Sequence, residues 1–425
     1  PQSLLASLFV IKQSSYSPLI SSHAMKVAVI KELFPGEHRV ALVPAVVSTL
    51  VKANHDVLIE SNAGLAAGFS DADYEQAGGT IVHRDEAFEA DCVLTVRACG
   101  AAGETWESDR KRMSSKSTII GMADPLGSCQ ACLEDAKTGA TIYALELVPR
   151  ITRAQSMDVL SSQANIAGYE AVLLGASALK KILPMMTTAA GTIRPAKALI
   201  LGAGVAGLQA IATAKRLGAQ VLAYDVRPAV KEQVESLGAK FVELDLETES
   251  SETKGGYAKA MTDEFYKKQQ ELLGKVIAEC DLVITTALIP GKPAPILITK
   301  AMVEGMQPGS VIVDLAAERG GNCEMTTPGE TTCFNGITIL GPTNLPAEVA
   351  THTSQLYSKN IVTFLNHLVS CGFPQETSDD EICRETLVTQ NGEVVHARVR
   401  DLAGMPQLPC ESPSQEGTGN ASSSS

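Results

Sequence analysis

Three glycines with the spacing GxGxxG, Gly202, Gly204 and Gly207, form the pattern in which a backbone turn can cradle a pyrophosphate. The apolar run 198–201 before them predicts a β-strand, and a helical stretch follows them. Asp225 ends the next predicted strand, 23 residues after Gly202, where a carboxylate can bind a ribose 2′-hydroxyl. These residues therefore predict a dinucleotide site on a strand–turn–helix unit.

Each residue of this pattern has a separate physical task. Gly202 permits the tight turn, Gly204 lets the backbone approach the phosphates, and Gly207 allows the helix to pack closely on the strand. Asp225 favours NAD over NADP because a 2′-phosphate would meet a like charge, although the nearby Arg227 could accept such a phosphate. A Rossmann-like domain that binds no nucleotide is the alternative interpretation of the same pattern.

A second group of polar residues, Arg150, Gln155, Asp158 and Ser161, lies at the start of a predicted helix. The intervals of three place Gln155, Asp158 and Ser161 on one face of that helix. Arg and Asp near a helix start are also typical of a salt bridge and an N-cap, so the spacing alone leaves their role open. Further along, the glycine pair 255–256 is typical of a hinge or of a flexible surface insertion.

Short apolar runs alternate with helical stretches, which predicts parallel sheets covered on both faces. The predicted strands are residues 25–30, 57–60, 92–96, 118–122 and 141–144 in a first set, and 198–201, 220–224, 282–286, 311–314 and 337–340 in a second. A long helix expected over about 158–183 joins the two sets. Its predicted apolar stripe consists of Ile166, Tyr169, Leu173, Ala176 and Leu179. The fold class is therefore α/β, with two Rossmann-like parallel-sheet domains joined by a long helix.

The same pattern divides the chain into segments. Residues 1–24 hold no acidic residue and many Ser, and we expect a leader or linker there. Residues 25–150 form the N-terminal α/β domain, which a helix over about 350–372 completes by packing back on it. Residues 165–345 form the NAD-binding Rossmann domain.

The remaining residues, 373–425, are polar and form a C-terminal extension. Asn391 followed by Gly392 suits a type I′ turn and predicts a hairpin within it. The Ser-rich and Gly-rich stretch from Ser412 predicts a disordered tail.

The composition excludes several classes of function. The 425 residues carry a formal net charge of −13 without a block of Lys or Arg, which argues against nucleic acid as a partner. No apolar segment reaches the ~20 residues of a membrane-spanning helix. The ten cysteines are scattered, as in a reducing compartment, and Cys129 and Cys132 lack the second pair that a zinc site needs. No metal is predicted.

Several longer motifs carry a resemblance to a known family. They are residues 150–158, 161–169, 255–259, 285–292 and 313–316. On these motifs the chain resembles, over about residues 25–400, the NAD(H)-binding domain I of proton-translocating NAD(P) transhydrogenase, of the alpha-subunit type, which is related to alanine dehydrogenase. The resemblance implies that the chain passes hydride between NADH and an NADP⁺ bound on a partner domain. Direct transfer between two nicotinamides needs no proton acceptor, only two rings held face to face with water kept out.

The resemblance also implies roles for individual residues. Arg150 fixes the nicotinamide carboxamide, Asp158 and Ser161 are its further hydrogen-bond partners, and Gln155 reaches toward the second nucleotide. Tyr257 belongs to a mobile loop that folds over bound NAD(H). The implied cofactor-binding residues are Gly202, Gly204, Val205, Gly207, Asp225, Val226, Arg227, Gly256, Tyr257, Gln269 and Leu288.

The resemblance implies partners and a location as well. The cofactors are NAD(H) on this chain and NADP(H) on a partner domain. The partners are that NADP(H)-binding domain and a membrane-spanning proton-channel domain, and the chain itself is a homodimer. It is then a soluble domain peripheral to a membrane, at the cytoplasmic face in a bacterium, or in the mitochondrial matrix or another organelle in a eukaryote.

Two alternatives stay open. An alanine-dehydrogenase-like amino-acid oxidoreductase shares the opening Lys31, Glu32 and Arg39 pattern. That enzyme uses a Lys and a His, whereas the corresponding strand here carries Arg97 and the segment 121–125 has no His. Arg39 is then expected to be structural. The second alternative is a catalytically silent module that binds NADH without transferring hydride.

Overall fold

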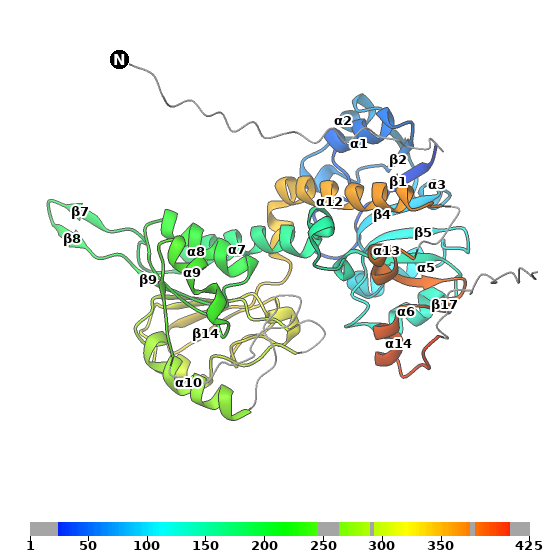
Figure 1. Ribbon diagram of the computed structural model, residues 1–425. Coiled ribbons are helices and arrows are strands. Elements are labelled where there is room, and N and C mark those ends of the chain that lie inside the picture. Colours follow the sequence, from blue (N-terminus) through cyan, green and yellow to red (C-terminus); the bar gives the residue numbers. More distant parts are fainter. Residues whose placement is uncertain (1–23, 245–262, 290–292, 375–378, 409–425) are drawn as a thin grey trace, which may run out of the picture.

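The computed structural model describes residues 24–244, 263–289, 293–374 and 379–408. These residues form two lobes, each with a central sheet and an apolar core on both sides of it (Figure 1). The predicted fold class, two α/β domains joined by a long helix, is confirmed. Both sheets are mixed rather than purely parallel, because antiparallel strands join their edges.

The first sheet has the strand order β17-β16-β6-β5-β4-β1-β2-β3. Its strands are β1 (Lys26–Val29), β2 (Asp56–Glu60), β3 (Thr80–Val82), β4 (Cys92–Arg97), β5 (Thr118–Met122), β6 (Thr141–Ala144), β16 (Leu387–Gln390) and β17 (Glu393–Val394). The strands from β1 to β6 pair in parallel. In β1, β4, β5 and β6, burial on both faces explains the near-continuous apolar sequences, which made these strands predictable.

The second sheet has the order β11-β10-β9-β12-β13-β15-β14. Its strands are β9 (Lys197–Leu201), β10 (Gln220–Tyr224), β11 (Lys240–Phe241), β12 (Leu282–Thr285), β13 (Val311–Asp314), β14 (Thr331–Phe334) and β15 (Ile337–Leu340). The order places β9 between β10 and β12, so the strand order reverses at β9. In open α/β sheets, ligands bind at such a reversal, beyond the carboxyl ends of the strands.

The helices of the described residues vary widely in length. They are α1 (Pro44–Lys52), α2 (Asp71–Gln76), α3 (Arg84–Ala87), α4 (Cys99–Ala102), α5 (Glu107–Arg110), α6 (Cys129–Ala136), α7 (Val159–Ala178), α8 (Val205–Arg216), α9 (Lys231–Ser236), α10 (Asp263–Ile277), α11 (Lys300–Glu304), α12 (Ala350–Ser370), α13 (Glu381–Thr386) and α14 (Ala397–Leu402). Of the two longest, α7 runs from the second lobe to the junction of the lobes, and α12 runs from that junction along the first lobe (Figure 1).

Helix α7 corrects one prediction. It ends at Ala178 rather than near residue 183, and the predicted stripe is not its buried face, since Tyr169 is exposed. Small residues face the core instead. A Cβ on Gly168 would lie 2.1 Å from the carbonyl oxygen of Ala206, and one on Gly175 would meet Leu282. Helix α7 therefore touches α8 almost backbone to backbone, which a search for large apolar residues does not detect.

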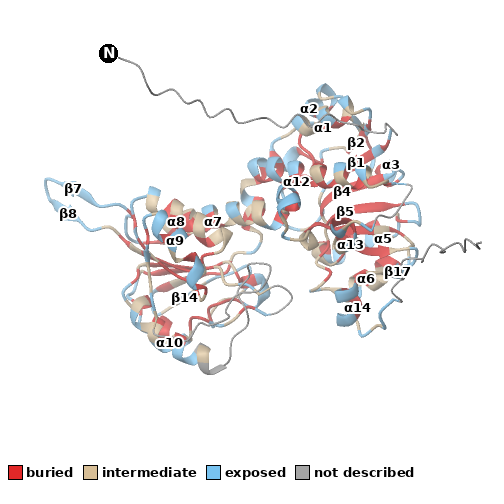
Figure 2. Cartoon of the chain, in the orientation of Figure 1, coloured by how far each residue is buried: buried red, intermediate tan, exposed pale blue. Residues whose placement is uncertain are grey.

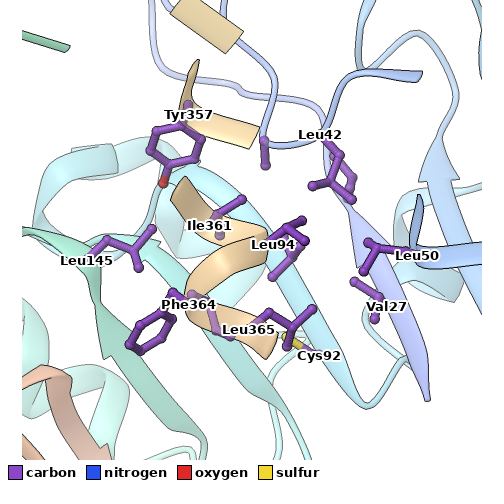
Figure 3. Close-up of a cluster of buried hydrophobic side chains, with 14 of the residues drawn as sticks. Val27, Leu42, Leu50, Cys92, Leu94, Leu145, Tyr357, Ile361, Phe364 and Leu365 are labelled. Atoms are coloured by element: carbon purple, nitrogen blue, oxygen red, sulfur yellow. The ribbon is translucent and has the colours of Figure 1, made fainter. Parts of the chain in front are cut away.

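Helix α12 packs on the first sheet. Tyr357, Ile361 and Phe364 are fully buried, and Figure 3 shows them beside Leu94 of β4 and Leu145. Strands β4 and β5 of this lobe are buried along almost their whole length (Figure 2). A helix from the end of the chain thus completes the core of its beginning.

The hairpin predicted at Asn391 is present. Asn391 and Gly392 have positive φ angles of 52° and 85°, as a type I′ turn requires, and they join β16 to β17. Strand β16 then pairs antiparallel with β6. Some of the residues that were expected to form a C-terminal extension therefore lie in the first sheet.

A second hairpin, β7 (Met186–Thr188) and β8 (Gly191–Ile193), extends away from the second lobe (Figure 1). Its strands are exposed along their whole length. Within the portion of the chain that the structure describes, no helix has the length and apolar character needed to cross a membrane.

Candidate functional site

A cavity of about 650 Å³ lies between the two lobes. The second lobe lines it with the turn after β9, the start of α8 and the carboxyl ends of β10 and β12. The first lobe lines it with Asp124, Glu146 and Arg150, and α7 adds its first turns, including Ser161. This volume falls within the roughly 300–1,000 Å³ typical of small-molecule sites. Residues from distant regions of the sequence therefore meet at one site.

The glycine turn has the geometry that its sequence predicts. Gly202 has a φ of 99°, which disfavours any side chain. A Cβ on Gly207 would lie 1.8 Å from the carbonyl oxygen of Gly202. Helix α8 can therefore pack this closely on the turn only when residue 207 is glycine. A Cβ on Gly204 would meet nothing within 4 Å, because this residue faces the cavity. A phosphate can therefore reach the backbone there.

Helix α8 begins directly at this open residue. Gly204 is its N-cap and no side chain caps the first turn. Val205 and Ala206 both line the cavity. The first N–H groups of a helix lack partners within the helix, and they favour an anion such as a pyrophosphate.

Asp225 and Arg227 form a buried ion pair at the end of β10. The Nε and Nη2 atoms of Arg227 donate to the Asp225 carboxylate at 2.8 and 2.7 Å, and the Ala203 amide donates to the same carboxylate at 2.7 Å. This carboxylate thereby links the glycine turn to β10. From the sequence the two charges were expected to act separately on a 2′-phosphate, whereas the structure couples them.

Gln269 of α10 presents an unused acceptor. Its side-chain amide donates to the Tyr224 hydroxyl at 2.8 Å, while its carbonyl oxygen is buried without a hydrogen-bond partner among the described residues. Both residues line the cavity. A buried acceptor of this kind is costly unless a ligand donates to it. The Gln269 oxygen therefore fits a site that becomes complete when occupied.

The loop that enters α7 forms the other end of the cavity. Asp158 is the N-cap of α7 and accepts from the Ser161 amide at 2.9 Å and from its hydroxyl at 2.6 Å. Ser161 lines the cavity, as does the exposed Arg150. Gln155 is exposed and is not among the lining residues.

One prediction from residue spacing is wrong. Gln155 lies in the 3₁₀ helix η4 (Thr152–Met157), and α7 begins only at Val159, after the N-cap Asp158. Gln155, Asp158 and Ser161 therefore do not share one face of a single helix. Asp158 instead has the N-cap role that the sequence pattern left open.

The other predicted cofactor residues have mixed positions. Val205, Val226 and Leu288 line the cavity, and Leu288 follows β12 at the carboxyl end of the sheet, as expected. Gly207 is a packing residue of the turn. Gly256 and Tyr257 lie outside the described residues.

Two acidic residues that were not predicted from the sequence belong to the site. One carboxylate oxygen of Glu146 accepts from the amides of Ala123 and Asp124, while the other is buried without a partner among the described residues. Burial raises the pKa of Glu146 to about 7. Asp124 accepts from Arg319 of the second lobe at 2.5 Å, so an ion pair spans the two lobes at the cavity. No local sequence pattern links these partners.

Arg39 is a structural residue, as expected. Its guanidinium is buried and donates to Glu37, to Gln163 of α7 at 2.7 Å and to Asn344 at 3.0 Å. Arg97 donates to the same Glu37 carboxylate at 2.9 Å. The paired arginines hold the pKa of Glu37 at about 2, against the effect of its burial. This cluster connects the first sheet to α7 and is not part of the cavity lining.

Comparisons with known proteins agree over both lobes. Residues 28–167 match the alanine dehydrogenase/PNT N-terminal domain, and residues 171–397 match the corresponding C-terminal domain. The chain is 46% identical over 390 residues to an NAD(P) transhydrogenase alpha subunit protein of Rhodospirillum rubrum, covering 88% of this chain and 98% of that one. It is 29% identical over 394 residues to an alanine dehydrogenase of Halomonas elongata, covering 90% and 97%.

Solved structures give the same result. A transhydrogenase of Sinorhizobium meliloti matches with a TM-score of 0.76 and 44% identity, covering 88% of this chain and 99% of that one. An L-alanine dehydrogenase matches with a TM-score of 0.75 and 28% identity, covering 89% and 99%. The resemblance read from the sequence motifs is thereby confirmed, and the chain belongs to the alanine dehydrogenase/PNT family.

Proposed function

We propose that this chain is the NAD(H)-binding component of a proton-translocating NAD(P) transhydrogenase of the Re/Si-specific type. It holds NAD(H) in the cavity and exchanges hydride with NADP(H) on a partner domain. The observation that carries the proposal is the cavity itself, which has a phosphate-binding turn at one end and the Arg150–Ser161 loop at the other. The 46% identity to a transhydrogenase alpha subunit protein over nearly its full length supports it.

The residues at the glycine turn fit a dinucleotide. The open backbone at Gly204 and the uncapped start of α8 suit the pyrophosphate, and the Asp225 carboxylate suits a ribose hydroxyl. The buried Gln269 oxygen offers one further acceptor. These groups bind the pyrophosphate and ribose of NAD(H) rather than its reacting ring. They therefore set the affinity for NAD(H) more than the rate of hydride transfer.

The other end of the cavity suits hydride transfer between two nicotinamides, which needs no Lys–His pair. None of the described residues that line the cavity is a Lys or a His. The reduced nicotinamide supplies a hydride, and the task of this chain is to orient the ring and exclude water. In the proposal Arg150 holds the carboxamide, Asp158 fixes the Ser161 hydroxyl, and Gln155 reaches toward the partner's nucleotide.

The proposal includes an assembly. The partners are the NADP(H)-binding domain and the membrane-spanning proton-channel domain, which place this chain at the membrane surface. The chain pairs with a second copy of itself. In support, the hairpin β7–β8 and the residue before it expose Met185, Met186 and Ile193, with Met185 66% accessible. Sedimentation analysis of Met185→Ser with Ile193→Ser tests the pairing, because the dimer should weaken.

Reconstitution tests the reaction. The purified chain is mixed with a transhydrogenase NADP-binding domain, and reduction of an NAD analogue by NADPH is followed by absorbance. We expect turnover that requires both components. As a control, Gln130→Asn should leave this turnover unchanged, since Gln130 is exposed on α6 and does not line the cavity. Absence of turnover with a chain that binds NADH would contradict the proposal and favour a silent NAD-binding module.

One observation favours a second candidate, an alanine-dehydrogenase-like oxidoreductase. Glu146 lines the cavity with an unpartnered oxygen and has a pKa of about 7, which suits a general acid or base near neutral pH. The test is oxidation of NADH by this chain alone in the presence of ammonia and pyruvate. Activity that is lost in Glu146→Gln would support this candidate over the transhydrogenase.

A further inference from the structure

Four side chains that suit a metal ion gather on the first lobe, outside the cavity. They are His367, Cys371, Asp380 and Cys383. One possible ligand atom from each residue lies within 4.8 Å of the ligand atoms of the other three. Paired Cys-x-x-Cys motifs are the usual sequence signal of a zinc site, and this group lacks them. Its donors come from two helix ends.

Local structure explains why the four residues meet. His367 lies in the last turn of α12 and Cys371 is the C-cap of that helix, so the two point the same way at a spacing of four. Asp380 is the N-cap of α13, and Cys383 lies in the first turn of α13. The end of one helix and the start of the next therefore present two donors each.

The four side chains already contact one another. The Nε2 atom of His367 lies 2.9 Å from Oδ1 of Asp380 and 3.7 Å from the Cys371 sulfur. The other carboxylate oxygen of Asp380 accepts from Arg153 at 2.5 Å. One carboxylate oxygen is thus held by an arginine, while the other accepts from the Ile382 amide at 2.9 Å and faces the imidazole.

We propose that these four residues bind a zinc ion. Two thiolates, an imidazole and a carboxylate are donors that zinc takes in a tetrahedral site. Bonds of about 2.0–2.3 Å place tetrahedral ligand atoms roughly 3.3–3.8 Å apart. The ligand atoms are at most 4.8 Å apart and the His367–Asp380 pair is 2.9 Å apart, so shifts of up to about 1 Å, closing some pairs and opening that one, form the site.

The charge balance also suits zinc. Binding releases the thiol protons of Cys371 and Cys383 to solvent, and His367 binds through a neutral ring nitrogen. Two thiolates and a carboxylate then leave the zinc centre with one net negative charge. The guanidinium of Arg153, already paired with Asp380, offsets that charge.

The surroundings allow the ion to enter and be retained. The side chains of His367 and Asp380 are 17% and 19% accessible, whereas Cys383 is buried. The accessible side gives the ion an entry path. The bound ion links α12, which completes the first core, to α13, which leads into β16.

The test measures metal content and needs no activity. The full chain is kept reduced, stripped with a chelator, supplied with Zn²⁺, desalted and analysed by mass spectrometry for zinc. We expect about one zinc ion per chain. Substitution of Co²⁺ should give the absorption of tetrahedral cobalt with a thiolate-to-metal band. Cys371→Ser should abolish that band and lower zinc affinity by at least about 10-fold.

Matched variants keep the result interpretable. Cys333→Ser removes an exposed thiol of β14 outside the group and should retain the zinc. Because Cys383 is buried, its substitution can impair folding, so the partly exposed Cys371 and His367 decide the matter, with circular dichroism confirming the fold. Equal zinc content in Cys371→Ser and wild type overturns the proposal. So does the absence of zinc from the wild type.

Discussion

The cavity wall from the second lobe is held by backbone geometry, whereas the wall from the first lobe is held by side chains. On the second lobe, Gly207 packs against the Gly202 carbonyl and α8 starts at the open Gly204. On the first lobe, the exposed Arg150 lines the cavity just before the short 3₁₀ turn η4, which Asp158 caps at its end. A site for a common cofactor can be rigid where it binds the invariant portions and adjustable where it positions the reacting ring.

The largest expected effect is on the backbone wall. Gly207→Ala places a Cβ against the Gly202 carbonyl, and neither backbone can yield without opening the turn. We expect a loss of about 3 kcal/mol in the free energy of unfolding, at the upper end of overpacking, together with loss of NADH binding. Denaturant titration and NADH fluorescence measure both.

A glycine elsewhere provides the matched control for this substitution. A Cβ on Gly274 of α10 would meet only the Met302 side chain at an ordinary 3.6 Å, so Gly274→Ala should be neutral or slightly stabilising. If Gly207→Ala behaves like Gly274→Ala, the backbone description of this wall is wrong.

The next effect belongs to the side-chain wall and depends on pH. The folded pKa of Glu146 is about 7, against 4.5 for an ordinary Glu, so the folded chain binds this proton more tightly than the unfolded chain does. The stabilisation is complete below the unfolded pKa and is lost as pH rises through 7. Glu146→Gln should therefore lose less stability between pH 5 and 8 than wild type, by up to about 3 kcal/mol.

This comparison needs a background correction. Glu32 also has a pKa of about 7, because of its burial and the neighbouring charge of Glu37, and it contributes equally in both proteins. Exposed Glu89 gives the control substitution Glu89→Gln, whose stability profile should follow the wild type. Parallel profiles for Glu146→Gln and wild type would show that the cavity carboxyl is ionised throughout.

The third prediction separates reaction from binding. Gln155 is exposed and outside the cavity lining, so Gln155→Asn should leave NADH affinity almost unchanged. A ring misplaced by about 1 Å can cost about 100-fold in rate, and we expect a loss of that order in single-turnover hydride transfer. Arg150→Ala should reduce both, since it removes a charged donor from the cavity. Wild-type transfer by Gln155→Asn would refute its positioning role.

The smallest effect concerns the choice of cofactor. Asp225→Ala removes a negative charge and the acceptor that holds Nε and Nη2 of Arg227. NADPH should then bind about 10-fold better relative to NADH, about 1.4 kcal/mol, which competitive titration measures. Asp401→Ala, an exposed change on α14, serves as control. An unchanged ratio would mean that the pair does not select between the cofactors.

The sequence predicts the backbone wall better than the side-chain wall, for physical reasons. Parallel strands buried on both faces are continuous apolar runs, and a GxGxxG turn encodes its geometry within six residues. Glu146, Asp124 and Arg319 come together only through the packing of two lobes, and Arg319 is 195 residues from Asp124. Sequence spacing carries no information about such a contact.

Helix α7 shows a second limit. Its contact face contains Gly168 and Gly175, which allow close packing because they have no side chain. Hydrophobic periodicity gives weight to large residues and so selected the face of Tyr169, which is exposed. The hairpin at Asn391 was predictable from its turn, but its pairing with β6 depends on a strand about 240 residues away in the chain.

The contact of Gly168 with Ala206 has a consequence for how this cavity can evolve. Most helix contacts can be retuned by small changes in side-chain size, but this one consists of backbone and has no adjustable element. The separation between the glycine turn and Ser161 is therefore fixed by the helix pair itself. We therefore expect variation in ligand preference to arise in the loop before α7, where a substitution changes a side chain at the cavity without moving the helix pair.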